Sequence, residues 1–174
     1  MGRSEEVGEL YLPWSRVSDF TCYACGLCCY RFRIPLKPHE AISIARTFGP
    51  QYIESIAGKQ YIRKREGEAC PFLIEDNGVG LCYLQSLGMK PSACKIWPFK
   101  IYRNPEHGRG EEAYYSHKLG EFYVYVDQRC PGIKLGRPTP RLVKAVEEAI
   151  EVWIGARRDQ LYTTAPLSSL IKKF

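Results

Sequence analysis

The sequence predicts an α+β protein that forms a single compact domain over residues 1–174, with short strands and hairpins around a cysteine-rich segment and a long helix near the C-terminus. Three observations support this prediction. The chain has 174 residues, 45% of them hydrophobic and 13% aromatic, which is enough for one core that buries about 70% of the unfolded surface. Strand-like and helix-like segments are interspersed along it. No repeat, low-complexity segment or linker divides them.

The first third of the chain predicts two strands, a turn and a helix. Residues 1–17 are typical of a lead-in strand and loop, and residues 18–29 of a compact knuckle. Residues 30–34 alternate apolar and basic side chains, as a half-buried strand does. Residues 37–48 have a helical pattern that begins next to a proline and ends before a Gly-Pro pair.

A hairpin is predicted in the middle of the chain. Residues 60–65 indicate a strand. Residues 70–74 and 80–84 indicate two more, on either side of Asp76-Asn-Gly78, which is typical of a tight turn. Each of these two strands contains one cysteine, and their pairing should bring the two thiols close together.

The remaining elements are a helical turn, a buried strand and the longest helix. Residues 90–94 indicate a short helical turn that ends before Pro98. Residues 122–126 are apolar on both faces and fit a central strand. Residues 139–158 predict a helix, capped by Thr139, whose role is core packing. Its apolar face comprises Leu142, Val146, Ala149, Ile150 and Trp153.

Cysteine is the residue type that points to chemistry. The chain has eight cysteines, and four of them lie within eight positions. A core can use Val, Ile or Leu and avoid thiol reactivity, whereas a soft metal ion or an iron–sulfur cluster requires converging thiolates. Four clustered and four dispersed thiols make two complete ligand sets. We therefore expect residues 18–132 to form a metal-binding part, with these candidate cofactor and metal ligands: Cys22, Cys25, Cys28, Cys29, Cys70, Cys82, Cys94 and Cys130.

Disulfide bonds are the alternative use of an even number of cysteines. The N-terminus does not favour export, because acidic residues stand where a signal peptide has its apolar run. Adjacent Cys28 and Cys29 are awkward to pair into two unstrained bridges. No apolar stretch reaches the roughly eighteen residues of a membrane span. We expect a soluble, cytoplasmic protein without a membrane partner; scarce Asn and Met hint at a thermophile, where intracellular disulfides do occur.

Four ordered blocks of the sequence carry a family resemblance. They are Phe20-x-Cys22-x-x-Cys25-Gly-x-Cys28-Cys29, then Cys70-Pro-Phe-Leu, then Cys82-Tyr-Leu, and then Lys90-Pro-x-x-Cys94-Lys-Ile-Trp-Pro-Phe99. Together they resemble the YkgJ-like cysteine-cluster family (CxxCxxCC), which is described as a zinc- or iron-chelating domain. The resemblance covers residues 18–132. It implies metal binding, with iron–sulfur as the more usual expectation.

The spacing of the cysteines favours iron–sulfur over zinc. The Cys-x-x-Cys-x-x-Cys run with a distant partner is close to the cluster-binding run of bacterial ferredoxins. Cys70-Pro71 and Cys130-Pro131 are similar to the Cys-Pro step that closes that run. Thiolates alone suit both metals. We expect one or two [4Fe–4S] clusters, with Zn²⁺ as the alternative.

Two partitions of the ligands remain open. Consecutive side chains diverge, so Cys28 and Cys29 more easily serve different sites or different irons. One partition joins Cys22, Cys25 and Cys28 to Cys130, and gives the second site Cys29, Cys70, Cys82 and Cys94. The other places one cluster on the N-terminal block and a second on the later four cysteines.

Two classes of function follow. In the first, the protein is a redox or electron-transfer carrier, or a component of a cluster-dependent enzyme, with a redox or protein partner. In the second, structural zinc supports a module that binds a protein or nucleic acid. No nucleophile–base constellation appears outside the cysteines, so no catalytic residue is predicted.

The charged residues give weaker signals. The net charge of +6 is modest. A basic stripe is more typical of a solvated strand face than of a nucleic-acid site, so nucleic acid is the less favoured partner. The stripe comprises Arg31, Arg33, Arg63, Lys64 and Arg65, with Phe32 and Tyr61 between them. His39, His107 and His117 are expected at the surface or in loops rather than as ligands.

Overall fold

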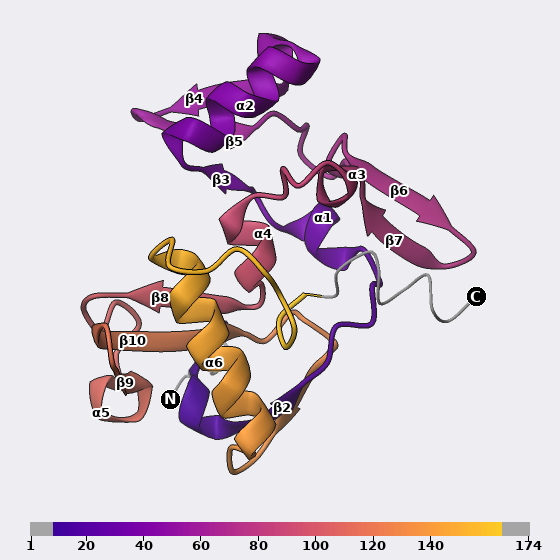
Figure 1. Ribbon diagram of the computed structural model, residues 1–174. Helices are drawn as coiled ribbons and strands as arrows, with labels where there is room; N and C mark the ends of the chain where they lie inside the picture. Colours follow the sequence, from indigo (N-terminus) through magenta and orange to yellow (C-terminus); the bar gives the residue numbers. More distant parts are fainter. Residues whose placement is uncertain (1–8, 165–174) are drawn as a thin grey trace, which may run out of the picture.

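Helices and strands form two layered parts, with the cysteine-bearing segments between and beside them (Figure 1). The computed structural model describes residues 9–164. One part contains the larger sheet and helix α6, and the other contains a smaller sheet and helix α2. The predicted α+β class is therefore confirmed. Among the helices of residues 9–164, none is both long and apolar enough to cross a bilayer.

The larger sheet is antiparallel and is built around one long strand. Its elements are β1 (Tyr11–Pro13), β10 (Gly120–Asp127) and β8 (Phe99–Tyr102) in that order, with β9 (Tyr114–His117) also paired to β10. Phe122, Val124 and Val126 in β10 are fully buried. The prediction of a central strand at residues 122–126 is confirmed.

Helix α6 (Pro140–Trp153) packs against β8, β2 (Val17–Phe20) and α4 (Ser92–Ile96). The Thr139 side chain accepts a hydrogen bond from the Leu142 N–H, so the predicted cap is present. The helix ends five residues before the predicted Arg158, because Gly155 adopts a left-handed φ of 80°. Two further elements complete this part: η1 (Trp14–Arg16), and β11 (Ile133–Leu135), which pairs with β2.

The smaller sheet lies against helix α2. Its strands are β3 (Pro35–Leu36), β5 (Lys59–Ile62) and β4 (Ile53–Ile56), with α2 (Pro38–Phe48) and η2 (Pro50–Tyr52) connecting β3 to β4. Helix α2 matches its predicted extent to within one residue, because Lys37 is its N-cap rather than its first residue. Strand β4 was not predicted, and β5 stops at Ile62 rather than continuing to residue 65.

The predicted strand over residues 30–34 is wrong. Helix α1 (Leu27–Arg31) takes the first two of these residues, and pairing begins only at β3. The alternation itself is real, because Phe32 and Ile34 are buried and Arg33 is exposed. Burial on alternate sides does not require a strand ladder, and residues 32–34 lie outside any strand.

The predicted hairpin is present. It consists of β6 (Leu73–Asp76) and β7 (Val79–Cys82), followed by the short helix α3 (Tyr83–Ser86). Asn77 and Gly78 have φ values of 47° and 75°, as a type I′ turn requires. The first strand begins three residues later than predicted, so Cys70 precedes the hairpin while Cys82 ends it. A last short helix, α5 (Gly110–Ala113), leads into β9.

Candidate metal centre

All eight thiols line one cavity of about 90 Å³. They reach it from α1 and the segment before it, from the segment before β6, from the end of β7, from α4 and from the segment after β10. All eight cysteines are free. Residues more than a hundred positions apart in the chain therefore face the same space.

The knuckle before α1 is built on two left-handed residues. Ala24 and Gly26 have φ values of 53° and 74°. The backbone N–H of Gly80 in β7 donates a 2.6 Å hydrogen bond to the Ala24 carbonyl. A Cβ at Gly80 would lie 2.7 Å from Gly26 Cα. This close approach requires glycine, and it fixes the strand that carries Cys82 against the knuckle.

Cys70 is attached to the N-terminal block through the backbone. Its N–H donates to the Cys29 carbonyl at 2.9 Å, and Lys64 Nζ donates to the same oxygen at 2.9 Å. Lys64, one residue of the basic stripe, therefore supports the backbone of the cysteine segment through the Cys29 carbonyl. Two other stripe residues form ion pairs, Arg33 with Glu54 and Arg65 with Glu68.

The segment after β10 closes the cavity from another direction. The Cys130 N–H bonds to the Asp127 carbonyl at 3.3 Å, and the Thr21 N–H bonds to the Gly132 carbonyl at 3.0 Å. A Cβ at Gly132 would lie 2.1 Å from the Thr21 oxygen, so glycine is required there. These contacts place Cys130 beside Cys22.

The buried thiols interact in two groups. Burial is the main cause that raises the pKa of Cys130 to about 11, and the charges of Cys22, Cys25 and Cys28 contribute to the same shift.

On the other side, burial raises the pKa of Cys70 to about 11, with a further contribution from Cys82. Desolvation raises the pKa of Cys94 well above its usual range, and Cys82 and Cys70 add to it. These thiols are protonated near neutral pH, so a bound metal must displace their protons.

Cys28 and Cys29 stand between the two groups. A hydrogen bond with the Cys29 side chain lowers the pKa of Cys28 to about 7, and the positive charge of Lys90 also lowers it. The same hydrogen bond is the main cause that raises the pKa of Cys29. The hydrogen bond between them therefore favours the thiolate form of Cys28 over that of Cys29.

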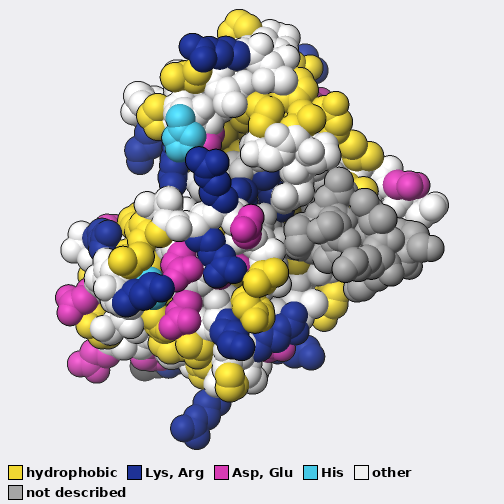
Figure 2. All heavy atoms as spheres, viewed as in Figure 1, with side chains coloured by type: hydrophobic (Ala, Val, Ile, Leu, Met, Phe, Trp, Pro, Cys, Tyr) yellow, Lys and Arg dark blue, Asp and Glu magenta, His cyan; other side chains and the backbone are white. Residues whose placement is uncertain are grey.

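The chemistry of the wall fits a thiolate-bound metal. The wall includes the cations Arg31, Lys90 and Arg129, and none of its residues, all in the described range, is Asp or Glu. A metal held by four thiolates carries net negative charge, which these cations offset. Figure 2 shows Lys and Arg side chains between the upper and lower halves of the molecule. The set of soft donors without carboxylates suits zinc or an iron–sulfur cluster.

The individual thiols are spread around the cavity. Within residues 9–164, no group of three Cys, His, Asp or Glu side chains is arranged to hold a single metal ion. The Gln85 amide also lines the cavity, and its Oε1 is buried without a hydrogen-bond partner. Sequence reasoning missed Gln85, Arg129 and Thr164, because nothing in their local sequence sets them apart. Lys90 stands in one of the quoted blocks, but nothing in the sequence assigns it a role at the site.

The histidines lie elsewhere. Of the cavity-lining residues in the described part of the chain, none is a histidine. The expectation of a surface position is wrong for His117, whose side chain is 4% exposed and lies 3.5 Å from Glu151. Its ring packs edge-on against Phe122.

Comparison with known proteins identifies the family. The profile of the CxxCxxCC family, described as "Putative zinc- or iron-chelating domain", matches residues 21–131. Neither the curated proteins nor the solved structures include a match to the chain. The matched range begins just before Cys22 and ends just after Cys130, and so contains every thiol of the cavity. By this match and by its thiol-lined cavity, the chain belongs to the CxxCxxCC family of metal-chelating domains.

Proposed function

We propose that the protein binds iron–sulfur clusters of the [4Fe–4S] type in the cysteine cavity and acts in electron transfer, or as the redox component of a cluster-dependent enzyme. One observation carries the proposal. Eight thiols line a single cavity whose wall has three cations and, among the described residues, no carboxylate. When bound, a [4Fe–4S] cluster supplies reversible one-electron transfer.

Each group of residues has a role in this proposal. The thiols hold the cofactor, and Arg31, Lys90 and Arg129 offset its negative charge. Phe20, Phe32 and Trp97 also line the cavity and limit the access of water. Because the ligands must be reduced, the proposal implies a reducing compartment such as the cytoplasm.

Two clusters are favoured over one, with Cys22, Cys25, Cys28 and Cys130 at the first site. Cys29, Cys70, Cys82 and Cys94 would then form the second. The support is electrostatic: Cys130 interacts with Cys22, Cys25 and Cys28, whereas Cys94 interacts with Cys82 and Cys70. Cys94 also interacts with Cys28, which stands at the boundary between the groups.

Structural zinc is the second candidate. The cysteine segments connect the part that contains the larger sheet with the part that contains α2. A metal bound there would fasten the two parts together, whatever its redox properties. The module would then act by binding a protein or, less favourably, a nucleic acid.

Anaerobic purification followed by measurement of iron, acid-labile sulfide and zinc tests the proposal. We expect brown protein with iron and sulfide in equal amounts, bleached by dithionite. Aerobic preparation would mislead, because exposed clusters degrade and the vacated thiols oxidise. Colourless protein that holds zinc and is indifferent to reconstitution with iron and sulfide would instead establish the structural role.

A further inference from the structure

The segment Gln160–Thr164 returns from the end of α6 to the cysteine cavity. Gln160, Thr163 and Thr164 are 6%, 5% and 5% exposed, although they lie outside any helix or strand. Thr164 is one of the residues that line the cavity. The family match ends at residue 131, so this part of the wall lies beyond the matched region.

The segment supplies hydrogen-bond partners to the last carbonyl groups of α4, the helix that carries Cys94. The last carbonyls of a helix have no partner within it, and Pro98 has no N–H to offer. Gln160 Nε2 donates to the Lys95 carbonyl at 3.1 Å. Thr164 Oγ1 lies 3.2 Å from the Cys94 carbonyl and 3.2 Å from the Lys95 carbonyl. The position of the Cys94 backbone therefore depends on this segment.

The same threonine holds one of the cavity cations. Lys90 Nζ donates to Thr164 Oγ1 at 2.9 Å. Lys90 also lines the cavity, and its charge acts on both Cys28 and Cys94. A single hydroxyl thus connects the backbone of a candidate ligand with the cation that faces it.

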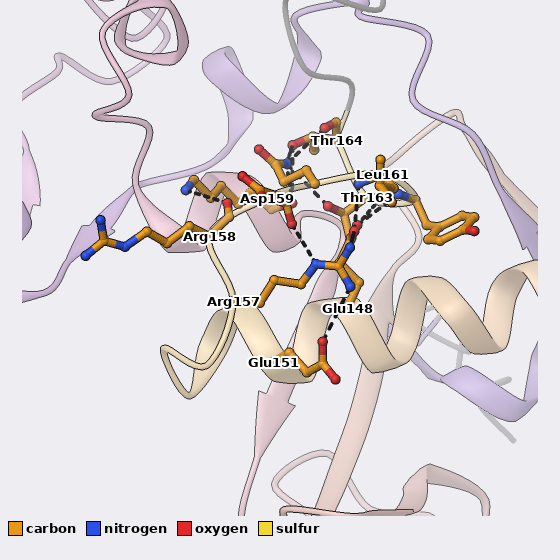
Figure 3. A network of polar contacts seen from close by, with 11 residues as sticks. Glu148, Glu151, Arg157, Arg158, Asp159, Leu161, Thr163 and Thr164 are labelled. Atoms are coloured by element: carbon orange, nitrogen blue, oxygen red, sulfur yellow. Dashed lines mark hydrogen bonds and ion pairs between the residues drawn. The ribbon is translucent and has the colours of Figure 1, made fainter.

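A buried carboxylate on α6 anchors the segment. Glu148 is 1% exposed. It accepts hydrogen bonds from the N–H groups of Leu161, Tyr162 and Thr163 at 2.6, 2.9 and 2.7 Å, and Arg157 lies 3.4 Å away. Figure 3 shows Glu148 on the helix with Leu161, Thr163 and Arg157 around it. These four donors fill the lone-pair positions of the carboxylate, which compensates its burial.

We propose that residues 160–164 complete the metal cavity: Thr164 forms part of its wall, Gln160 and Thr164 position Cys94 and Lys90, and Glu148 holds this wall segment in place. The inference rests on the proposed function in one respect, which is that Cys94 is taken to be a metal ligand. It makes Glu148, Gln160 and Thr164 positioning residues rather than ligands.

The test uses two matched pairs of variants. Glu148→Gln removes the anchoring charge and turns an amide NH₂ toward backbone donors. Glu147→Gln makes the same change one residue away, where the carboxylate accepts from the Tyr115 hydroxyl instead. Thr164→Val removes the hydroxyl without changing the shape of the side chain, and Thr164→Ser restores it.

The first readout is the alkylation rate of each cysteine in metal-free protein, followed by mass spectrometry. We expect Glu148→Gln and Thr164→Val to raise the rate at Cys94 about tenfold, since losing a buried hydrogen bond shifts a local opening equilibrium by about that factor. Cys130, on the other side of the cavity, should change less than about twofold, as should every cysteine in the two control variants. A general loss of stability would instead raise the rates at Cys94 and Cys130 together.

The second readout is metal retention under chelator challenge, with iron-reconstituted and zinc-loaded protein tested in parallel. We expect Thr164→Val to lose metal faster than wild type and Thr164→Ser to retain it. An unchanged alkylation rate at Cys94 in Thr164→Val would overturn the proposal that this segment positions Cys94. The Thr164→Val result decides this even if Glu148→Gln fails to fold. If wild type binds no metal but the Cys94 rate still rises selectively, the wall stands and the metal-binding function fails.

Discussion

The two sides of the cysteine cavity differ in how they are enclosed. The knuckle side is open: Cys25 is exposed, and its neighbours Tyr23 and Leu27 are 59% and 37% exposed. The opposite side, with Cys70 and Cys94, is enclosed by α1, α4 and the segment 160–164. Both sides depend on distant contacts, the knuckle on Gly80 and the Cys130 segment on Thr21, but the enclosed side is held in addition by the segment 160–164. The open side is therefore the more accessible to solvent, and the enclosed side the more covered by packed elements.

Removing all metal should have the largest effect, because it removes the link between the two sides. Coordination contributes directly to folding free energy. We expect the Tm to fall by about 15 °C, equivalent to about 5 kcal/mol for a domain of this size. Thermal melts before and after chelation, with metal content measured on the same samples, provide the check. An unchanged melt after complete removal would show that the cavity is not a folding element.

Serine substitutions should separate the two sides. We expect Cys82→Ser to destabilise by about 4 kcal/mol and Cys25→Ser by about 2 kcal/mol, since only the first leaves an enclosed ligand set incomplete. Denaturant titration gives the stabilities, and metal analysis should show partial retention in Cys25→Ser. Equal losses of stability and metal would mean that the eight thiols act as one site.

Gly80→Ala tests the backbone contact that joins the hairpin to the knuckle. The new Cβ would lie 2.7 Å from Gly26 Cα, which neither backbone can avoid without moving. We expect a loss of about 3 kcal/mol together with weaker metal retention. Gly88→Ala is the control, because Gly88 has a left-handed φ of 68° but no neighbour within 4 Å. It should cost about 1 kcal/mol and leave metal content unchanged.

Lys100 should give the smallest effect. Burial lowers its pKa to about 8, while its ammonium lies 4.0 Å from the centre of the Phe32 ring on the enclosed side. Above pH 8 the folded protein binds fewer protons at this group than the unfolded chain, whose lysine titrates near 10.5. Its contribution to stability therefore increases as the pH rises from about 8 to about 10.5.

The measurement is the stability difference between wild type and Lys100→Met as a function of pH. We expect wild type to gain about 2 kcal/mol relative to the variant between pH 8 and pH 10. A difference independent of pH would mean that Lys100 is no harder to protonate in the folded state than in the unfolded chain.

Several elements follow from local sequence alone. The Asn-Gly pair at positions 77 and 78 predicts the hairpin turn, because few other residues adopt two successive left-handed conformations at low cost. The helices α2 and α6 follow from apolar periodicity and their proline-marked starts. The eight cysteines themselves define the candidate ligand set, since their spacing has no packing explanation.

Other features could not be predicted because they depend on contacts between distant residues. Residues 30–34 have the burial pattern of a strand without a strand partner. Glu147 and Glu148 are adjacent in the chain and look alike in sequence. Only helical spacing indicates that Glu148 faces inward, because it lies three residues after Ala145 and four before Val152, which are both buried. The groups that bind this carboxylate are the backbone N–H groups of residues 161–163, which only the folded chain brings next to it.

The sequence by itself therefore determined the family, the candidate ligands and most local elements, because these depend on short-range spacing and on the chemistry of thiols. Only the tertiary structure decided which thiols lie together, which cations face them and which backbone supports Cys94. Those arrangements depend on close approaches such as Gly80 to Gly26 and on buried hydrogen bonds from residues 160–164. Local sequence does not encode such contacts, because both partners must first be brought together by folding.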